Sequence, residues 1–174
     1  MSKKVIRVGL NVKDINKAIR EVNKFKEDFR KKVDTYRKRI ADEIAVQASL
    51  NFGNSTVDDV INGSSRTPDV QVSVSERGKV AVVIADGEDA VWCEFGAGVY
   101  HNGSVGSSPN PYGEDLGFTI GSYGKGYGKK QVWGYYDEDS NLILTRGTPA
   151  TMPMYNAAQE IMRKSVEIAR EVFG

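Results

Sequence analysis

The residue types that most often carry catalysis are scarce in this sequence and are not grouped. His101 is the only histidine, and it lies in a Gly-rich stretch rather than in a regular element. A site with several histidines is therefore excluded within one chain, and a histidine-based triad is not favoured. Cys93 is the only cysteine and lies in an apolar run, where a packed thiol is more common than a nucleophile.

The glycines of residues 121–130 invite comparison with a phosphate-binding loop, but the spacing does not fit. A loop of that type around Gly128 and Lys129 needs glycine at 123 and Ser or Thr at 130, where this chain has Tyr123 and Lys130. Paired carboxylates such as those at 58–59 and 88–89 lie in expected turns. We therefore expect a protein that is not an enzyme and that uses no metal or cofactor.

The densest apolar run, residues 90–98, is interpreted as a strand at the centre of the fold. Val91, Cys93 and Phe95 would share one face of it, and Trp92 and Glu94 the other. Gly96 and the two small residues after it would end the strand. Arg146, in a linker that passes near the sheet, is the expected ion-pair partner of Glu94.

One long amphipathic helix, or two nearly collinear ones, is predicted before this run. Apolar residues recur at helical spacing from Ile15 to Ala48, with Asp14 as the expected N-cap and Gly53 as the C-cap. Opposite charges four residues apart line its polar face. A solvated face is the simpler interpretation of these charges, and a DNA-binding face is the alternative.

Four further strands are expected, over 70–75, 80–84, 132–136 and 142–145. A C-terminal helix follows, capped by Thr151 or Met152 and carrying Pro153 in its first turn. The sequence thus predicts one α+β domain spanning 1–174. An antiparallel β-sheet of about five strands would have the long N-terminal helix and the C-terminal helix packed on one face, with a long Gly-rich loop inserted between strands.

The Gly-rich insertion, residues 98–131, is expected to be flexible until a neighbouring subunit orders it. It is too rich in aromatic residues for a mere spacer, and we expect these to act as interface anchors while its lysines meet an acidic surface or DNA. The candidate assembly residues are Tyr100, Tyr112, Phe118, Tyr123, Lys125, Tyr127, Lys129 and Lys130.

Charge is distributed unevenly along the chain. Residues 1–43 contain 14 basic and 7 acidic residues, a net charge of +7, whereas residues 44–174 carry −6. Such subunits can associate through complementary ends. No apolar run approaches the roughly 18 residues of a membrane span, so we expect no membrane partner.

The order of these parts resembles the tail-completion, or head–tail joining, family of lambda-like long-tailed bacteriophages and prophages. The resemblance lies in two motifs, Ala-Val-Trp-x-Glu-Phe-Gly at 90–96 and Thr-Arg-Gly-x-Pro-Ala-x-x-Pro-Met at 145–154, and in a Trp-x-Tyr-Tyr hairpin at 133–136. The family often has Gly-Thr after Glu-Phe, where this chain has Gly96 and Ala97.

This resemblance implies a structural virion protein of the neck. It would form a homo-oligomeric ring that joins the capsid portal complex to the tail tube and lets double-stranded DNA pass without reading its sequence. Its other partners would be neck, portal-adaptor and tail-terminator or tail-tube proteins, met during assembly in the bacterial cytoplasm. The alternative is a small non-enzymatic nucleic-acid-binding or host-directed module that uses the basic N-terminal helix.

Overall fold

The computed structural model describes residues 5–98, 108–113, 115–118 and 132–174. It is an elongated molecule built along one long helix, α1 (Val12–Gly53). In chain order, α1 is followed by β1 (Gln71–Arg77), β2 (Val80–Asp86), α2 (Asp89–Phe95), β3 (Trp133–Tyr136), β4 (Leu142–Thr145) and α3 (Pro153–Phe173). None of the described helices combines the length and apolarity needed to span a bilayer.

Helix α1 is longer than the helix predicted between the caps Asp14 and Gly53. Its 42 residues extend over about 63 Å at 1.5 Å per residue. The N-cap is Asn11 rather than Asp14: the Asn11 side chain accepts a hydrogen bond from the Asp14 backbone N–H at 2.9 Å, and its amide donates to the Asp14 carboxylate at 2.8 Å. The reciprocal pair satisfies a free backbone N–H and starts the helix one turn earlier than predicted.

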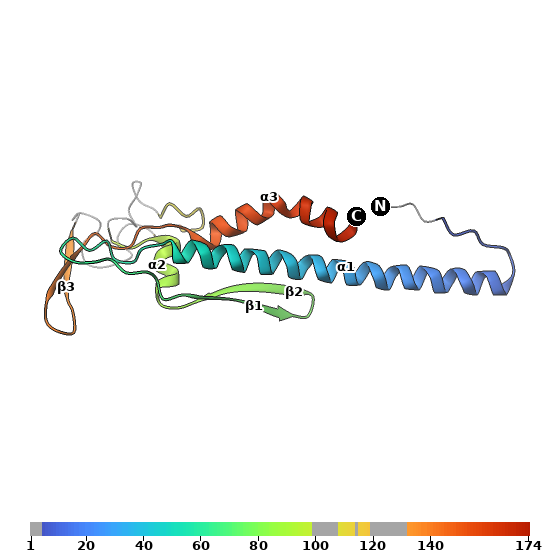
Figure 1. Cartoon of the computed structure of the whole chain (residues 1–174), viewed down its shortest axis with the longest axis horizontal. Helices are drawn as coiled ribbons and strands as arrows, with labels where there is room; N and C mark the ends of the chain where they lie inside the picture. Colours follow the sequence, from blue (N-terminus) through green and yellow to red (C-terminus); the bar gives the residue numbers. More distant parts are fainter. Residues whose placement is uncertain (1–4, 99–107, 114, 119–131) are drawn as a thin grey trace.

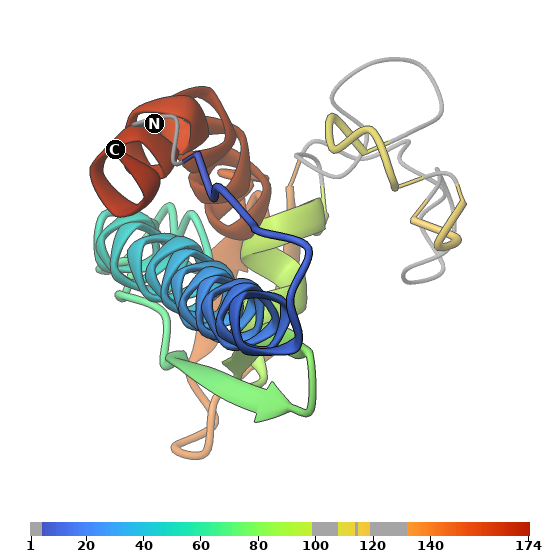
Figure 2. The same ribbon diagram turned by 90° about the vertical axis from the view of Figure 1, so that its right-hand side faces the viewer.

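Two elements pack on opposite sides of α1. The antiparallel hairpin β1–β2, with Val74 opposite Val83, lies along one side, and α3 lies along the other (Figures 1 and 2). Helix α3 runs antiparallel to α1: Asn51 donates to the carbonyl of Pro153 at one end, and the Tyr36 and Phe173 rings meet at the other, 6.0 Å apart. The helices and the hairpin therefore form three layers with α1 in the middle.

The second hairpin, β3–β4, lies at the end of the molecule opposite the start of α1 (Figure 1). A loop from the end of α1 runs beside β4. Ile61 donates to the Leu144 carbonyl, and Asp59 exchanges hydrogen bonds with Gly147 and Arg146. These bonds anchor the hairpin to the body of the protein.

The expected fold class is confirmed in its coarse form and wrong in detail. The structure is α+β with long N- and C-terminal helices and antiparallel strands, but the described residues form four strands in two separate two-stranded sheets rather than one sheet of about five. Helix α3 packs on α1 and not beside it on a sheet face.

The missing strand is the central run, which forms helix α2. Asp89, Ala90 and Cys93 are its buried residues, a spacing of one helical turn, while Val91 is exposed. Over seven residues, alternation and helical periodicity share most of their positions, so the apolar pattern alone did not separate them. Gly96, with φ of 80°, ends the helix as its C-cap.

The apolar core lies where α1, α2 and the hairpin β1–β2 meet. Phe52, Val57, Ala90 and Cys93 are buried together there. Along the contact between α1 and α3 the buried residues include Ala41 and Ala48 of α1 with Ala157 of α3, small residues that let two helices approach closely.

Replacing Phe52 by Ala is expected to lower the free energy of unfolding by roughly 3–5 kcal/mol, because the ring is buried in the core and its removal leaves a cavity. Urea unfolding followed by circular dichroism measures this change. Leu50→Ala, two residues away on the exposed side of α1, is the control and should cost less than about 1 kcal/mol. Equal losses for the two variants would show that Phe52 is not a core residue.

Candidate assembly interface

The two motifs that are far apart in the sequence meet at the start of α3. The Glu94 carboxylate accepts hydrogen bonds from the backbone N–H groups of Met154 and Tyr155, at 2.8 and 3.0 Å, and from the side-chain amide of Asn110 at 2.9 Å. Glu94 comes from α2 and supplies acceptors for helix N–H groups that have no partner inside α3. An acidic group is also favoured at a helix N-terminus by the helix dipole.

The residues just before α3 are held by α2 as well. The carbonyl of Cys93 accepts from the backbone N–H groups of Thr151 and Met152, at 2.9 and 3.1 Å. Met152 is the N-cap and has φ of 52°, a left-handed conformation that costs a non-glycine residue about 1–2 kcal/mol. Pro153 is fully buried at the first helical position, as predicted.

Burial raises the pKa of Glu94, and its three hydrogen bonds only partly offset that rise. The predicted partner of Glu94, Arg146, is wrong: Arg146 pairs with Asp59 at 3.1 Å in a largely exposed ion pair. The physical reason is that backbone N–H groups of α3 satisfy the carboxylate, so no cation is required beside it.

Gly147 of the second motif lies directly against the chain that leaves α2. It has φ of 99°, and a Cβ there would overlap the carbonyl oxygen of Ala97. The Ala97 N–H donates to the Thr148 carbonyl at 2.9 Å in the same place. Glycine is therefore required here both for backbone conformation and for close approach.

The described part of the Gly-rich segment packs on α2. The Ser108 hydroxyl donates to the Phe95 carbonyl at 2.6 Å, and the Phe118 ring stacks on Phe95 with centroids 4.2 Å apart. Tyr112 is 58% exposed, and the edge of its ring meets Tyr155 of α3. Of these two expected anchors, Phe118 packs within the subunit and Tyr112 remains open to a partner.

Six of the eight expected assembly residues lie outside the described residues, as does most of the Gly-rich insertion that contains them. They are Tyr100, Tyr123, Lys125, Tyr127, Lys129 and Lys130. The motif residues all fall in the described part. Trp92 is half-buried on α2, on the turn that carries Glu94 and Phe95.

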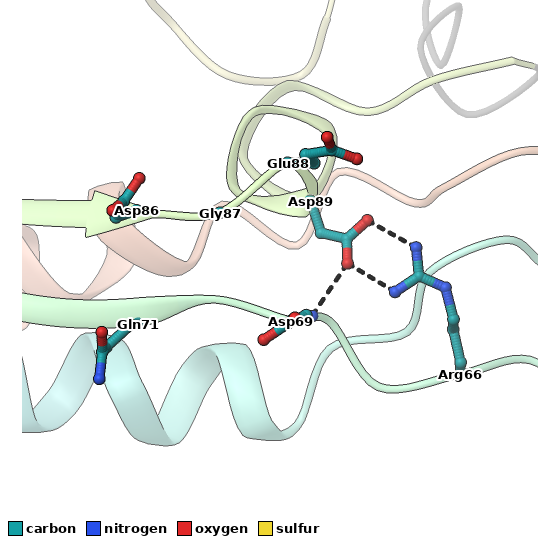
Figure 3. A pocket seen from close by; sticks show the side chains of 7 residues that line it. All are labelled: Arg66, Asp69, Gln71, Asp86, Gly87, Glu88 and Asp89. Carbon is teal, nitrogen blue, oxygen red and sulfur yellow. Dashed lines mark hydrogen bonds and ion pairs between the residues drawn. The ribbon is translucent and has the colours of Figure 1, made fainter.

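An open polar pocket of about 450 Å³ lies between the start of α2 and the hairpin β1–β2 (Figure 3). Arg66 forms two hydrogen bonds with the Asp89 carboxylate, at 2.6 and 2.8 Å, and the Asp69 N–H donates to it at 2.9 Å. Burial pushes the pKa of Asp89 upward, but these donors hold it below its ordinary value. The carboxylate is thus fully occupied in joining the loop to α2, and no described cluster of His, Cys, Asp or Glu is arranged to hold a metal ion.

The first half of α1 is an exposed apolar surface that the sequence interpretation did not single out. Helix α3 ends at Phe173, which contacts Phe29, and the hairpin turn ends at Gly78, beside Arg37. Beyond these points α1 extends without either layer (Figure 1). The apolar side chains of this bare part and of its boundary with α3, which we call the α1 stripe, are 41–61% exposed. They are Ile15, Ile19, Val22, Phe25, Phe29 and Val33.

The sequence contained the signal for this surface. The apolar pattern of the first helix extends over 34 residues, from 15 to 48, while that of the C-terminal helix covers only 154–173. One helix half as long cannot cover the whole stripe at 1.5 Å per residue. The N-terminal residues 5–11 do not bury it either, since Val5, Val8 and Leu10 are themselves exposed.

Gly147→Ala should destabilise the protein by more than about 1 kcal/mol, since the new Cβ meets the Ala97 carbonyl in a backbone conformation unfavourable for alanine. The matched control is Gly53→Ala at the end of α1, where a Cβ has open space and alanine is expected to be neutral or stabilising by about 0.5–1 kcal/mol. Thermal unfolding compares the two. Similar melting temperatures would contradict the close contact at Gly147.

The raised pKa of Glu94 gives a pH dependence of defined sign. Its stabilising contribution is complete below the pKa of a solvated Glu, about 4.3, and is lost as pH rises through the higher folded-state pKa. Relative to Glu94→Gln, the wild type should therefore lose stability as the pH rises from about 4 through the folded-state pKa of Glu94. Urea unfolding at several pH values measures the difference, with Glu167→Gln as a surface control. A difference that grows in favour of the wild type with pH would show that the hydrogen bonds outweigh burial.

Comparison with protein-family models, with curated proteins and with solved structures found no match to this chain.

Proposed function

We propose that this protein is a non-enzymatic structural component of the neck of a long-tailed bacteriophage, where copies of it form a ring between the portal complex and the tail tube. The proposal starts from the two motifs shared with the tail-completion family. It is supported by their place in the fold, because Glu94 and Gly147 connect α2 to the start of α3 and act on one subunit's architecture rather than on a substrate.

The observation that carries the proposal is the α1 stripe. An isolated helix is marginally stable in water, and most helices depend on packing of their apolar face. Here about half of the longest helix presents large apolar side chains to solvent, including Phe25 at 61% exposure. Contiguous apolar surface of this kind marks an interaction site. Each such side chain contributes up to roughly 1.5–3 kcal/mol when it becomes fully buried.

Binding of DNA by the same helix is the second candidate function. Residues 12–33 contain eight basic and four acidic residues, and a net charge of +4 attracts phosphates. The regular apolar stripe favours a protein partner over DNA, since the charged phosphates present no apolar surface that could bury Phe25 and Phe29. Under the ring proposal, DNA passes through the lumen without being bound tightly.

The double variant Ile19→Ser, Phe25→Ser should abolish self-association, because it removes two central groups of the stripe while keeping the helix start and the core. Light scattering over a concentration series and electron microscopy of the purified protein compare it with the wild type. The control, Val46→Ser, Leu50→Ser, changes two equally exposed apolar residues of α1 outside the stripe and should leave rings intact. A wild-type protein that stays monomeric at all concentrations would end the ring proposal.

The virion gives the corresponding functional test. A phage that lacks this protein should accumulate filled heads and separate tails, and the wild-type gene but not the stripe variant should restore joined particles. Infectious particles formed without the protein would contradict a role in the neck. Tight DNA binding by the monomer, weakening steeply with salt, would favour the second candidate.

A further inference from the structure

We infer that the α1 stripe binds the β3–β4 hairpin of a second copy of this chain, so that subunits join head to tail. This inference rests on the proposed ring and deepens it by naming the two faces that meet. We call residues 135–142 the acidic hairpin. It comprises Tyr135, Tyr136, the tip Asp137, Glu138 and Asp139, and Leu142 at the start of β4.

The two faces lie at opposite ends of the elongated molecule (Figure 1). The acidic hairpin therefore cannot fold back onto its own α1 stripe, and contact between them requires two chains. A contact between two different faces is heterologous, so each subunit keeps one free face for the next neighbour. That is the connectivity of a ring.

The chemistry of the two faces is complementary. The hairpin carries three acidic residues and no basic residue between 135 and 142, whereas residues 12–33 of α1 carry a net charge of +4. Both faces are also apolar at their centre: Tyr136 is 72% exposed and Leu142 47% exposed. Tyrosine and phenylalanine are enriched in the buried centres of interfaces, with charges around the rim.

The same charges disfavour pairing of one α1 stripe with another. Such a contact would bring two segments of +4 together, and like charges placed opposite each other oppose association. Lys26 and Arg30 follow Phe25 and Phe29 along one edge of the stripe, and among the described residues neither forms an ion pair with a carboxylate. These two cations are placed to meet Glu138 and Asp139 of the neighbour.

The test exchanges charge across the proposed contact. In the full chain, Lys26→Glu with Arg30→Glu, or Glu138→Lys with Asp139→Lys, should each weaken self-association about tenfold or more at low salt. A mixture of the two variants should associate again. The acidic stripe of one variant then meets the basic hairpin of the other, and their two unchanged faces also fit each other. Asp137 is left unchanged because its carboxylate accepts the Asn141 N–H at 2.8 Å and holds the turn.

The matched control is Lys24→Glu with Lys31→Glu, which changes net charge by the same amount on the opposite side of α1. It should associate like the wild type. If the control weakens association as much as the test pair, or if mixing restores nothing, the inference is wrong. If the wild type forms rings that neither charge variant disturbs, the ring proposal survives and only this choice of faces fails.

Cross-linking locates the contact directly. Cysteines introduced at Ile19 and at Tyr136 should form a disulfide between chains and give a ladder of covalent oligomers on denaturing gels. The native Cys93 does not interfere, because it is fully buried and burial raises the pKa of its thiol to about 12. A covalent dimer from Ile19→Cys alone would instead show that two α1 stripes face each other.

Discussion

The structure depends on one carboxylate placed where a helix begins. Glu94 accepts the first free N–H groups of α3, and the adjacent carbonyl of Cys93 holds the two residues before it. Together they fix where α3 starts and in which direction it leaves α2. Because α3 then runs along α1, this joint also determines how far along α1 the cover extends. The point on α1 from which α3 starts is thus fixed by a hydrogen-bonded cap whose acceptor lies about 60 residues away in sequence.

Most regular elements could be predicted from local pattern, and the failures share a cause. The apolar periodicity from Ile15 to Ala48 and the alternation in both hairpins each extend over several periods. The helix and the strands predicted from them were confirmed. The run at α2 is only seven residues long, too short for its periodicity to decide between helix and strand. The predicted partner of Glu94 was wrong because nearly every residue has a backbone N–H group, so these donors leave no mark in the sequence, whereas the charge of Arg146 does.

The motif residues and the proposed assembly surfaces occupy different places in the structure. Glu94, Gly96, Gly147 and Pro153 join α2 to α3 through backbone contacts that tolerate little change. The α1 stripe and the acidic hairpin are exposed and lie at the two ends. A search for these motifs therefore identifies the connection between α2 and α3 and not the proposed interface.

Subunits that join through two different ends, as in the proposed ring, can also form open filaments. A heterologous contact closes into a ring only if the turn between successive copies is fixed, and otherwise gives filaments. Here both contact faces belong to elements tied to the same body. Helix α1 is continuous from the stripe into the core at Phe52, and the hairpin β3–β4 is bonded to the loop at Asp59 and Ile61 that follows α1 directly. In the proposed ring, this one helix would set the angle between the two faces, and through that angle the number of copies at which the ring closes.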